Sequence, residues 1–158
     1  MDTTPLRDAY RALLDAADTV DTGAAPGPGE WNADQILAHV SLVNAATLAA
    51  ASCVAAGANT TYDNRTASDA WTIDRLITLA GGGAGLRERI RLQGDALCTL
   101  GPTLSEAELD TPVPALLLSG GTVLVDQPMA LREIITGLAE GELPGHTKQL
   151  LSLVPTSR

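Results

Sequence analysis

The chain has 158 residues, of which 45% are hydrophobic, and it carries a formal net charge of -9 at pH 7. This length suits one sizeable core, so we expect residues 1–158 to form a single domain. An excess of acidic over basic side chains excludes the electrostatic footprint of a nucleic-acid-binding protein and disfavours recruitment to an anionic membrane surface.

Two helical patterns separated by a loop fill the first third of the chain. Apolar residues recur at helical spacing over Thr4–Val20, with a proline in the first turn. The segment Asp21–Glu30 is rich in glycine and proline and is expected to be a loop. Asn32 is a good N-cap for a second helix, which is expected to run to about Ala56.

The next part of the chain predicts a loop and an interrupted helix. Residues 57–68 are polar and are expected to form a loop, after which a third helix starts near Ser68 or Asp69. Three consecutive glycines at positions 81–83 are costly inside a helix, so they predict a kink, a break or a close helix crossing. The helical pattern resumes over Leu86–Leu100.

The last third predicts a short extended connection and a long helix. Two apolar runs, Val113–Leu118 and Thr122–Val125, flank Ser119-Gly120-Gly121, which favours a small hairpin, although an extended crossover without strand pairing accounts for the same pattern. A fourth helix is expected from Gln127 or Pro128 to about Leu153. Its inward face has apolar ends and a polar middle: Leu131, Ile135, Leu138, Glu142, His146, Gln149 and Leu153. These patterns predict an all-α fold, a bundle of helices.

The location of the protein is expected to be cytoplasmic. The N-terminus has no basic segment followed by an apolar one, as a secretory signal would have, and no uninterrupted apolar run is long enough to span a bilayer. Cys53 and Cys98 are too few and too far apart in sequence for a disulfide framework, and a reducing cytosol would keep them as thiols.

The two histidines of the chain, His39 and His146, mark the candidate site. Glu142 precedes His146 by four residues, so the two share one helix face, and burying them is costly unless they are paired or metal-bound. Three explanations stay open. A divalent metal binds both together with His39, as in a catalytic site with an open position; Glu142 and His146 pair only with each other; or the helix ends at Glu142, because Leu-Pro-Gly is a turn signal.

Two further polar residues are candidate neighbours of this group. Gln149 lies about one turn after His146 and either hydrogen-bonds that imidazole or belongs to a polar layer in the core. Asn44 lies five residues after His39 and either points toward the bundle interior or satisfies a backbone group, which is the favoured interpretation.

Two segments resemble the DinB-like superfamily. Trp31 is followed eight residues later by His39 in Ile36-Leu37-Ala38-His39-Val40, which is similar to the family's Trp-…-Leu-Leu-Ala-His-Leu. The segment Glu142-Leu143-Pro144-Gly145-His146-Thr147-Lys148-Gln149-Leu150 resembles the superfamily's His-x-x-x-His-x-Gly-Gln-Leu, with glutamate at the first position. It also resembles the Glu-x-x-x-His of the metal-binding N-terminal domain of mycothiol-dependent maleylpyruvate isomerase.

This resemblance implies a four-helix bundle with up-down-down-up topology, in which His39, Glu142 and His146 hold a divalent metal, most simply zinc. Mycothiol or another low-molecular-weight thiol would bind at the open position. The implied function is a zinc-dependent, thiol-using enzyme, either a cis–trans isomerase or a thiol S-transferase, that acts on a small electrophilic substrate. The alternative is a non-catalytic metal- or ligand-binding helical bundle. Relatives are commonly dimers, so a homodimer is expected.

The chain departs from the family pattern at Pro144-Gly145, which lies between the two residues of the last helix that would bind metal. A proline inside a helix removes a backbone hydrogen bond and clashes with the preceding turn. The pair therefore predicts a kink or a widened turn at the site. The isomerase also has a small C-terminal domain that contributes to its active site, and its contacts would have to be replaced here.

Overall fold

The computed structural model describes residues 1–20 and 26–154, which form a mostly helical protein with a three-stranded sheet. Its helices are α1 (Thr4–Thr19), α2 (Ala33–Ala55), α3 (Ala70–Ala80), α4 (Gly83–Leu100), α5 (Glu106–Leu109), α6 (Leu131–Gly137) and α7 (Leu143–Ser152). A π-helical segment, Leu138–Glu142, joins α6 to α7. The strands are β1 (Tyr62–Asp63), β2 (Pro112–Ser119) and β3 (Thr122–Ala130).

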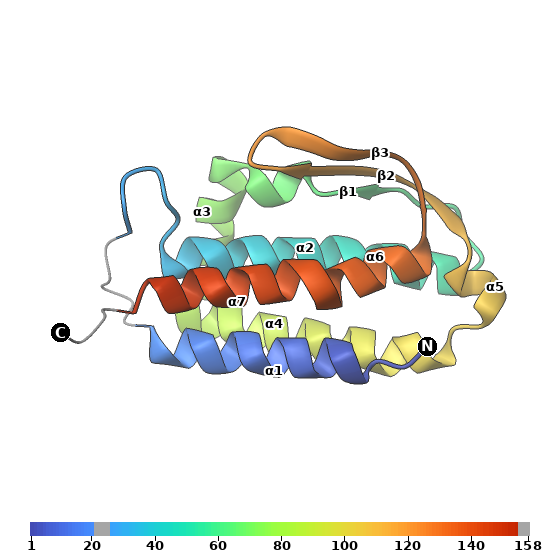
Figure 1. The fold of residues 1–158 in the computed structure, drawn as a ribbon, viewed down its shortest axis with the longest axis horizontal. Helices are drawn as coiled ribbons and strands as arrows, with labels where there is room; N and C mark the ends of the chain where they lie inside the picture. The colour runs from blue at the N-terminus through green and yellow to red at the C-terminus, as the bar shows by residue number, and fades with distance from the viewer. Residues whose placement is uncertain (21–25, 155–158) are drawn as a thin grey trace.

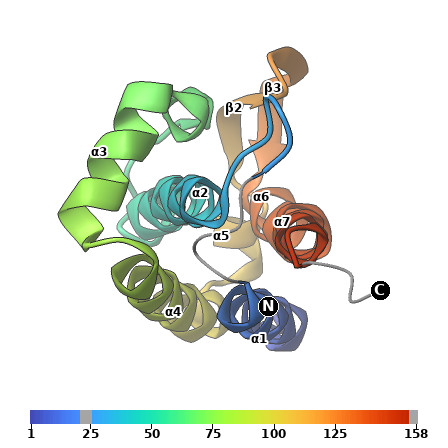
Figure 2. The same ribbon diagram turned by 90° about the vertical axis from the view of Figure 1, so that its left-hand side faces the viewer.

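The long helices lie side by side and enclose the core. Figure 1 shows α1, α2, α4 and the continuous α6–α7 segment aligned along the long axis, and Figure 2 shows them end-on with α3 outside them. The chain runs in one direction through α1 and α6–α7 and in the opposite direction through α2 and α4 (Figure 1). Aliphatic side chains from these helices are fully buried between them: Leu13, Ile36, Leu37, Leu86, Ile90, Leu131, Leu143 and Leu150.

The first two helices confirm the sequence prediction. α1 ends at Thr19, one residue earlier than expected. At the start of α2, the Gln35 N–H donates to Oδ1 of Asn32 over 2.9 Å, and the Asn32 N–H donates to Oε1 of Gln35 over 3.0 Å. This capping box fixes where the helix that carries the first histidine begins. Of the predicted loop, residues 21–25 lie outside the described part of the chain, and residues 26–30 are non-helical.

Polar residues interrupt helix α2, as expected, but the helix is nevertheless a candidate membrane span. Its 23 residues, with a mean hydropathy of 1.6 over the most apolar window, are long and apolar enough by length and composition. However, 61% of that window is buried inside the fold. A helix that is apolar on most sides is a membrane span or a buried core helix, and the burial identifies α2 as a core helix.

The glycine-rich segment separates two helices rather than bending one. Gly81 and Gly82 have φ angles of 77° and 82°, a region that favours glycine because it has no Cβ. Helix α4 then begins at Gly83, three residues earlier than expected. A Cβ atom at Gly85 would lie only 1.8 Å from the carbonyl oxygen of Ala80, so the close approach of α3 and α4 requires glycine there.

The hairpin predicted before the last helix is present and is longer than expected, which excludes the unpaired crossover. β2 and β3 pair antiparallel and are joined at Gly120-Gly121, whose φ angles of 55° and 79° suit a two-residue type I′ turn. β3 includes Gln127 and Pro128, so the last helix starts at Leu131 instead of at either of them. Pro128 is tolerated because β3 is an edge strand.

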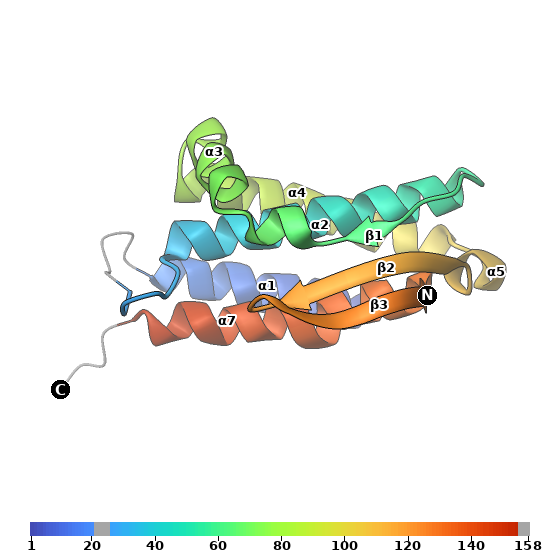
Figure 3. The same ribbon diagram turned by 90° about the horizontal axis from the view of Figure 1, so that it is seen from above.

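The prediction that residues 57–68 form only a loop is wrong. Tyr62 and Asp63 form β1, which pairs parallel with β2, and a 3-10 turn follows at Arg65–Ser68. The fold is therefore mostly helical rather than all-α. Seen from above, the sheet lies over α2 and α6 (Figure 3), which places the hairpin above the polar middle of the last helix.

Candidate metal centre

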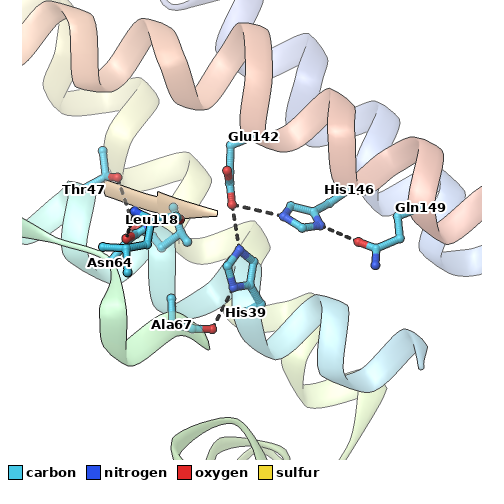
Figure 4. Close-up of polar contacts among 9 residues, drawn as sticks. His39, Thr47, Asn64, Ala67, Leu118, Glu142, His146 and Gln149 are labelled. Atoms are coloured by element: carbon cyan, nitrogen blue, oxygen red, sulfur yellow. Dashed lines mark hydrogen bonds and ion pairs between the residues drawn. The ribbon is translucent and has the colours of Figure 1, made fainter. Parts of the chain in front are cut away.

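Three side chains from two distant stretches of the sequence meet beneath the hairpin. Figure 4 shows His39 from α2 pointing toward Glu142 and His146 on the last helical segment. Oε1 of Glu142 lies 2.8 Å from Nε2 of His39 and 3.1 Å from Nε2 of His146. One nitrogen or oxygen atom of each residue lies within 4.8 Å of the other two. The group could therefore hold a metal ion with two nitrogen ligands and one oxygen ligand.

The outer nitrogen of each imidazole is fixed by a hydrogen-bond acceptor. Nδ1 of His39 lies 2.7 Å from the carbonyl oxygen of Ala67, and Nδ1 of His146 lies 2.8 Å from Oε1 of Gln149. Because a carbonyl oxygen only accepts, each Nδ1 carries a hydrogen and donates it. Both Nε2 atoms are thereby turned toward Glu142, which is how protein partners orient imidazoles around a metal ion.

A positive charge is required between Glu142 and the two imidazoles. A neutral imidazole with its hydrogen on Nδ1 presents a lone pair at Nε2, and a carboxylate oxygen presents only lone pairs. At 2.8 and 3.1 Å these atoms repel one another unless a proton or a metal cation lies between them. The group therefore suits two states, protonated imidazoles without metal or neutral imidazoles around a cation.

In the metal-free protein these contacts shift the pKa of Glu142 and of His146. Burial alone raises the pKa of the Glu142 carboxyl, but the hydrogen bonds from His146 and His39 outweigh it and lower the pKa to about 2 from an ordinary value of 4.5. Burial lowers the pKa of His146, but the hydrogen bond and charge of Glu142 outweigh it, so that pKa is raised. A proton and a metal ion would therefore compete for Nε2 of His146.

A widened helical turn precedes this part of the site. The Leu143 N–H donates to the carbonyl oxygen of Leu138, five residues earlier, in the π pattern. Pro144, which has no N–H to donate, follows directly after this widened turn as the second residue of α7. The predicted widened turn is thus present, on the N-terminal side of the proline, and the helix does not end at Glu142. Such π turns are frequent at functional sites.

A cavity of about 710 Å³ is lined in part by the three side chains. Its walls come from α2 and the segment before it, from the hairpin and from α6 with the π-helical turn. Apolar residues dominate these walls, among them Val43, Leu117, Leu124, Met129 and Leu138. The ring of Trp31 also lines the cavity and lies 5.0 Å from the His39 ring. The volume lies within the range of small-molecule sites.

Of the two predicted neighbours, only Gln149 reaches the group, through its hydrogen bond to His146. Asn44 is fully buried elsewhere: its Oδ1 accepts from the Tyr10 hydroxyl over 2.9 Å, and its Nδ2 lies 3.5 Å from Oε1 of Gln93. The prediction of Asn44 as a neighbour of His39 is therefore wrong. Five residues along an α-helix rotate a side chain by about 140°, which turns Asn44 toward α1 and α4.

Comparison with known proteins agrees with the sequence motifs. The sequence profile of the DinB superfamily matches residues 3–142, which make up most of the chain and include His39 and Glu142. The chain belongs to the DinB superfamily. Proteins of this superfamily often bind metal. His146 lies beyond the matched residues, so its place in the group comes from the geometry. No curated protein and no solved structure matches the chain.

Two residues that support the site in this DinB-superfamily chain were missed by sequence reasoning. Ala67 orients His39 through its backbone carbonyl, which every residue has, so no sequence signal could identify it. Asn64 is buried and pairs with the backbone of Leu118 in the hairpin, accepting the N–H over 2.8 Å and donating to the carbonyl over 2.9 Å (Figure 4). One short segment therefore holds both the hairpin and the histidine.

Proposed function

We propose that this DinB-superfamily protein binds one divalent metal ion, best fitted by zinc, through Nε2 of His39, Nε2 of His146 and a carboxylate oxygen of Glu142. The observation that carries the proposal is that both Nδ1 atoms donate to acceptors, so both Nε2 atoms face the carboxylate. Two imidazoles and one carboxylate suit zinc, and three protein ligands are typical of zinc sites that keep a position for an external ligand.

We further propose that the protein is an enzyme that uses a low-molecular-weight thiol, with mycothiol favoured by the resemblance to maleylpyruvate isomerase. Bound zinc would lower the pKa of a thiol, so that the nucleophilic thiolate is the species present. Addition to an electrophilic double bond, rotation and elimination give cis–trans isomerisation, whereas displacement of a leaving group gives S-transfer. Gln149 and Ala67 would hold the imidazoles in place, and the apolar walls would limit the access of water.

The arrangement of the helices supports an up-down-down-up four-helix bundle, with α1 and α6–α7 opposed to α2 and α4. We propose that residues 1–158 form one domain. The net charge of -9 supports a small-molecule substrate over a nucleic-acid or membrane partner. We also propose that the protein is cytoplasmic and forms a homodimer.

Metal analysis of protein purified without chelator tests the first part of the proposal. We expect close to one equivalent of zinc per chain, and less than about a tenth of an equivalent would overturn it. His39→Ala should lose the metal while keeping the helical circular dichroism spectrum. Glu140→Gln is the matched control, because Glu140 is an exposed acidic residue in the same π-helical segment and should leave the metal content unchanged.

The absorbance of the cobalt-substituted protein tests the second part. Addition of 2-mercaptoethanol should produce a sulfur-to-cobalt charge-transfer band, because the thiolate would enter the open position. An unchanged spectrum in a protein that holds a full equivalent of cobalt would favour the non-catalytic metal-binding bundle instead.

A further inference from the structure

Charged residues are distributed unevenly between the cavity and the outer surface. Besides the two histidines, the charged side chains that line the cavity are Glu30, Glu133 and Glu142. Within residues 1–20 and 26–154, no arginine or lysine lines it. The described walls therefore offer carboxylates, but no side-chain cation other than a protonated histidine.

Arginine side chains that could have served the cavity are paired on the outer surface. Arg65 pairs with Asp63 at 2.6 Å, although it lies in the segment next to the site. Arg132, the residue before Glu133, pairs with Glu106 at 2.6 Å on the other side of α6. Lys148 lies two residues after His146, about 200° around the helix, and is exposed. A carboxylate inside the cavity would find none of them as a partner.

Two of the acidic residues lie at the mouth of the cavity. Glu30 and Glu133 are exposed and also line it, so they stand where a ligand enters. Oε2 of Glu133 accepts the Ala130 N–H over 2.9 Å, which holds this carboxylate at the start of α6. Apart from the His39, Glu142 and His146 group, the lining includes many apolar side chains. A carboxylate that does not bind the metal would be repelled at the mouth and would then lose water without gaining a cationic side chain as its partner.

We infer that the cavity takes uncharged, largely apolar small molecules and discriminates against ligands that carry a carboxylate. The inference rests on the proposed function only in that the ligand's reacting atom would reach the metal. The discrimination itself comes from the walls and the mouth of the cavity. A site for a dicarboxylate substrate would instead need a cationic side chain in its wall, as carboxylate-binding sites with arginine have.

The isosteric thiols 4-mercaptobenzamide and 4-mercaptobenzoate test this inference, because they differ by one charge and their rigid rings prevent chelation by the second group. Absorbance of the cobalt-substituted protein measures binding to the metal. Fluorescence of the Trp71→Phe variant measures entry into the cavity: the chain has two tryptophans, Trp71 is exposed on α3, and the remaining Trp31 lines the cavity. The amide should bind about tenfold more tightly than the carboxylate by both measurements.

The double variant Glu30→Gln/Glu133→Gln should raise the ratio of the carboxylate affinity to the amide affinity at least about threefold. Glu140→Gln, which is exposed but does not line the cavity, should change neither affinity. Equal or tighter binding of the carboxylate, or no effect of either compound on Trp31, would overturn the inference. A fluorescence preference for the amide with a silent cobalt spectrum would support the inference while overturning the thiol-using function.

Discussion

Replacing Glu142 by glutamine in the metal-free protein removes a charge and keeps the shape of the side chain. In that state the carboxylate accepts hydrogen bonds from His39 and His146, and its side chain is only 29% exposed. A pKa of about 2 in place of 4.5 corresponds to about 3 kcal/mol of stabilisation, at about 1.4 kcal/mol per pKa unit. Because glutamine can keep one hydrogen bond, Glu142→Gln should lower the free energy of unfolding by about 2 kcal/mol at pH 6.

Urea unfolding with chelator present, measured from pH 6 to pH 2, tests both the magnitude and the sign. Because the folded-state pKa of Glu142 is lowered, its stabilisation is fully present above pH 4.5 and is lost as the pH falls toward about 2. The difference between wild type and Glu142→Gln should therefore shrink over this range. Glu140→Gln should stay within about 0.5 kcal/mol of wild type. Equal losses in both variants, or a difference independent of pH, would refute the reasoning.

Zinc affinity should rise between about pH 5 and 8, because the raised pKa of His146 keeps a proton on its metal-facing nitrogen at lower pH. Titration calorimetry measures the zinc affinity at each pH, and an affinity that does not change with pH would contradict competition between the proton and the metal. Gln149→Ala should weaken zinc binding by about 10- to 100-fold, since His146 loses the acceptor that orients it. A chelator competition assay measures the zinc affinity, and in this assay the exposed control Lys148→Ala should match wild type. Asn64→Ala should lower the free energy of unfolding by about 2 kcal/mol, because the Leu118 N–H and carbonyl lose their buried partner; hydrogen exchange should show lost protection at Leu118, and retained protection would contradict this role.

Helix ends with side-chain caps were the most predictable parts of the fold. Asn32 could be identified as the start of α2 because its side chain accepts the N–H of Gln35, three residues later, a local interaction that leaves a sequence signature. The last helix was placed too early, because only pairing with β2 makes Gln127 and Pro128 part of a strand, and this contact leaves no local signal in the sequence. The two-residue strand at Tyr62 is too short to show any periodicity.

The candidate site likewise has residues that the sequence could predict and contacts that it could not. His39, Glu142 and His146 could be selected from the sequence because they are polar residues within helical patterns and fit a family motif. The contacts that support these three residues could not be predicted, since Ala67 accepts a hydrogen bond through its backbone carbonyl and Asn64 hydrogen-bonds to a strand 54 residues away. The error at Asn44 is one of helical phase: the residue is buried as a polar group in the core, but on the face that meets Tyr10.

Anomalous X-ray diffraction at the zinc edge, from crystals of the zinc-loaded protein, tests the central claim most directly. The account predicts one strong peak about 2.0–2.2 Å from Nε2 of His39, Nε2 of His146 and a carboxylate oxygen of Glu142. It also predicts that the two Nδ1 contacts, to Ala67 and Gln149, are retained. A crystal with no peak between these side chains, or with zinc bound only elsewhere on the chain, would contradict the account.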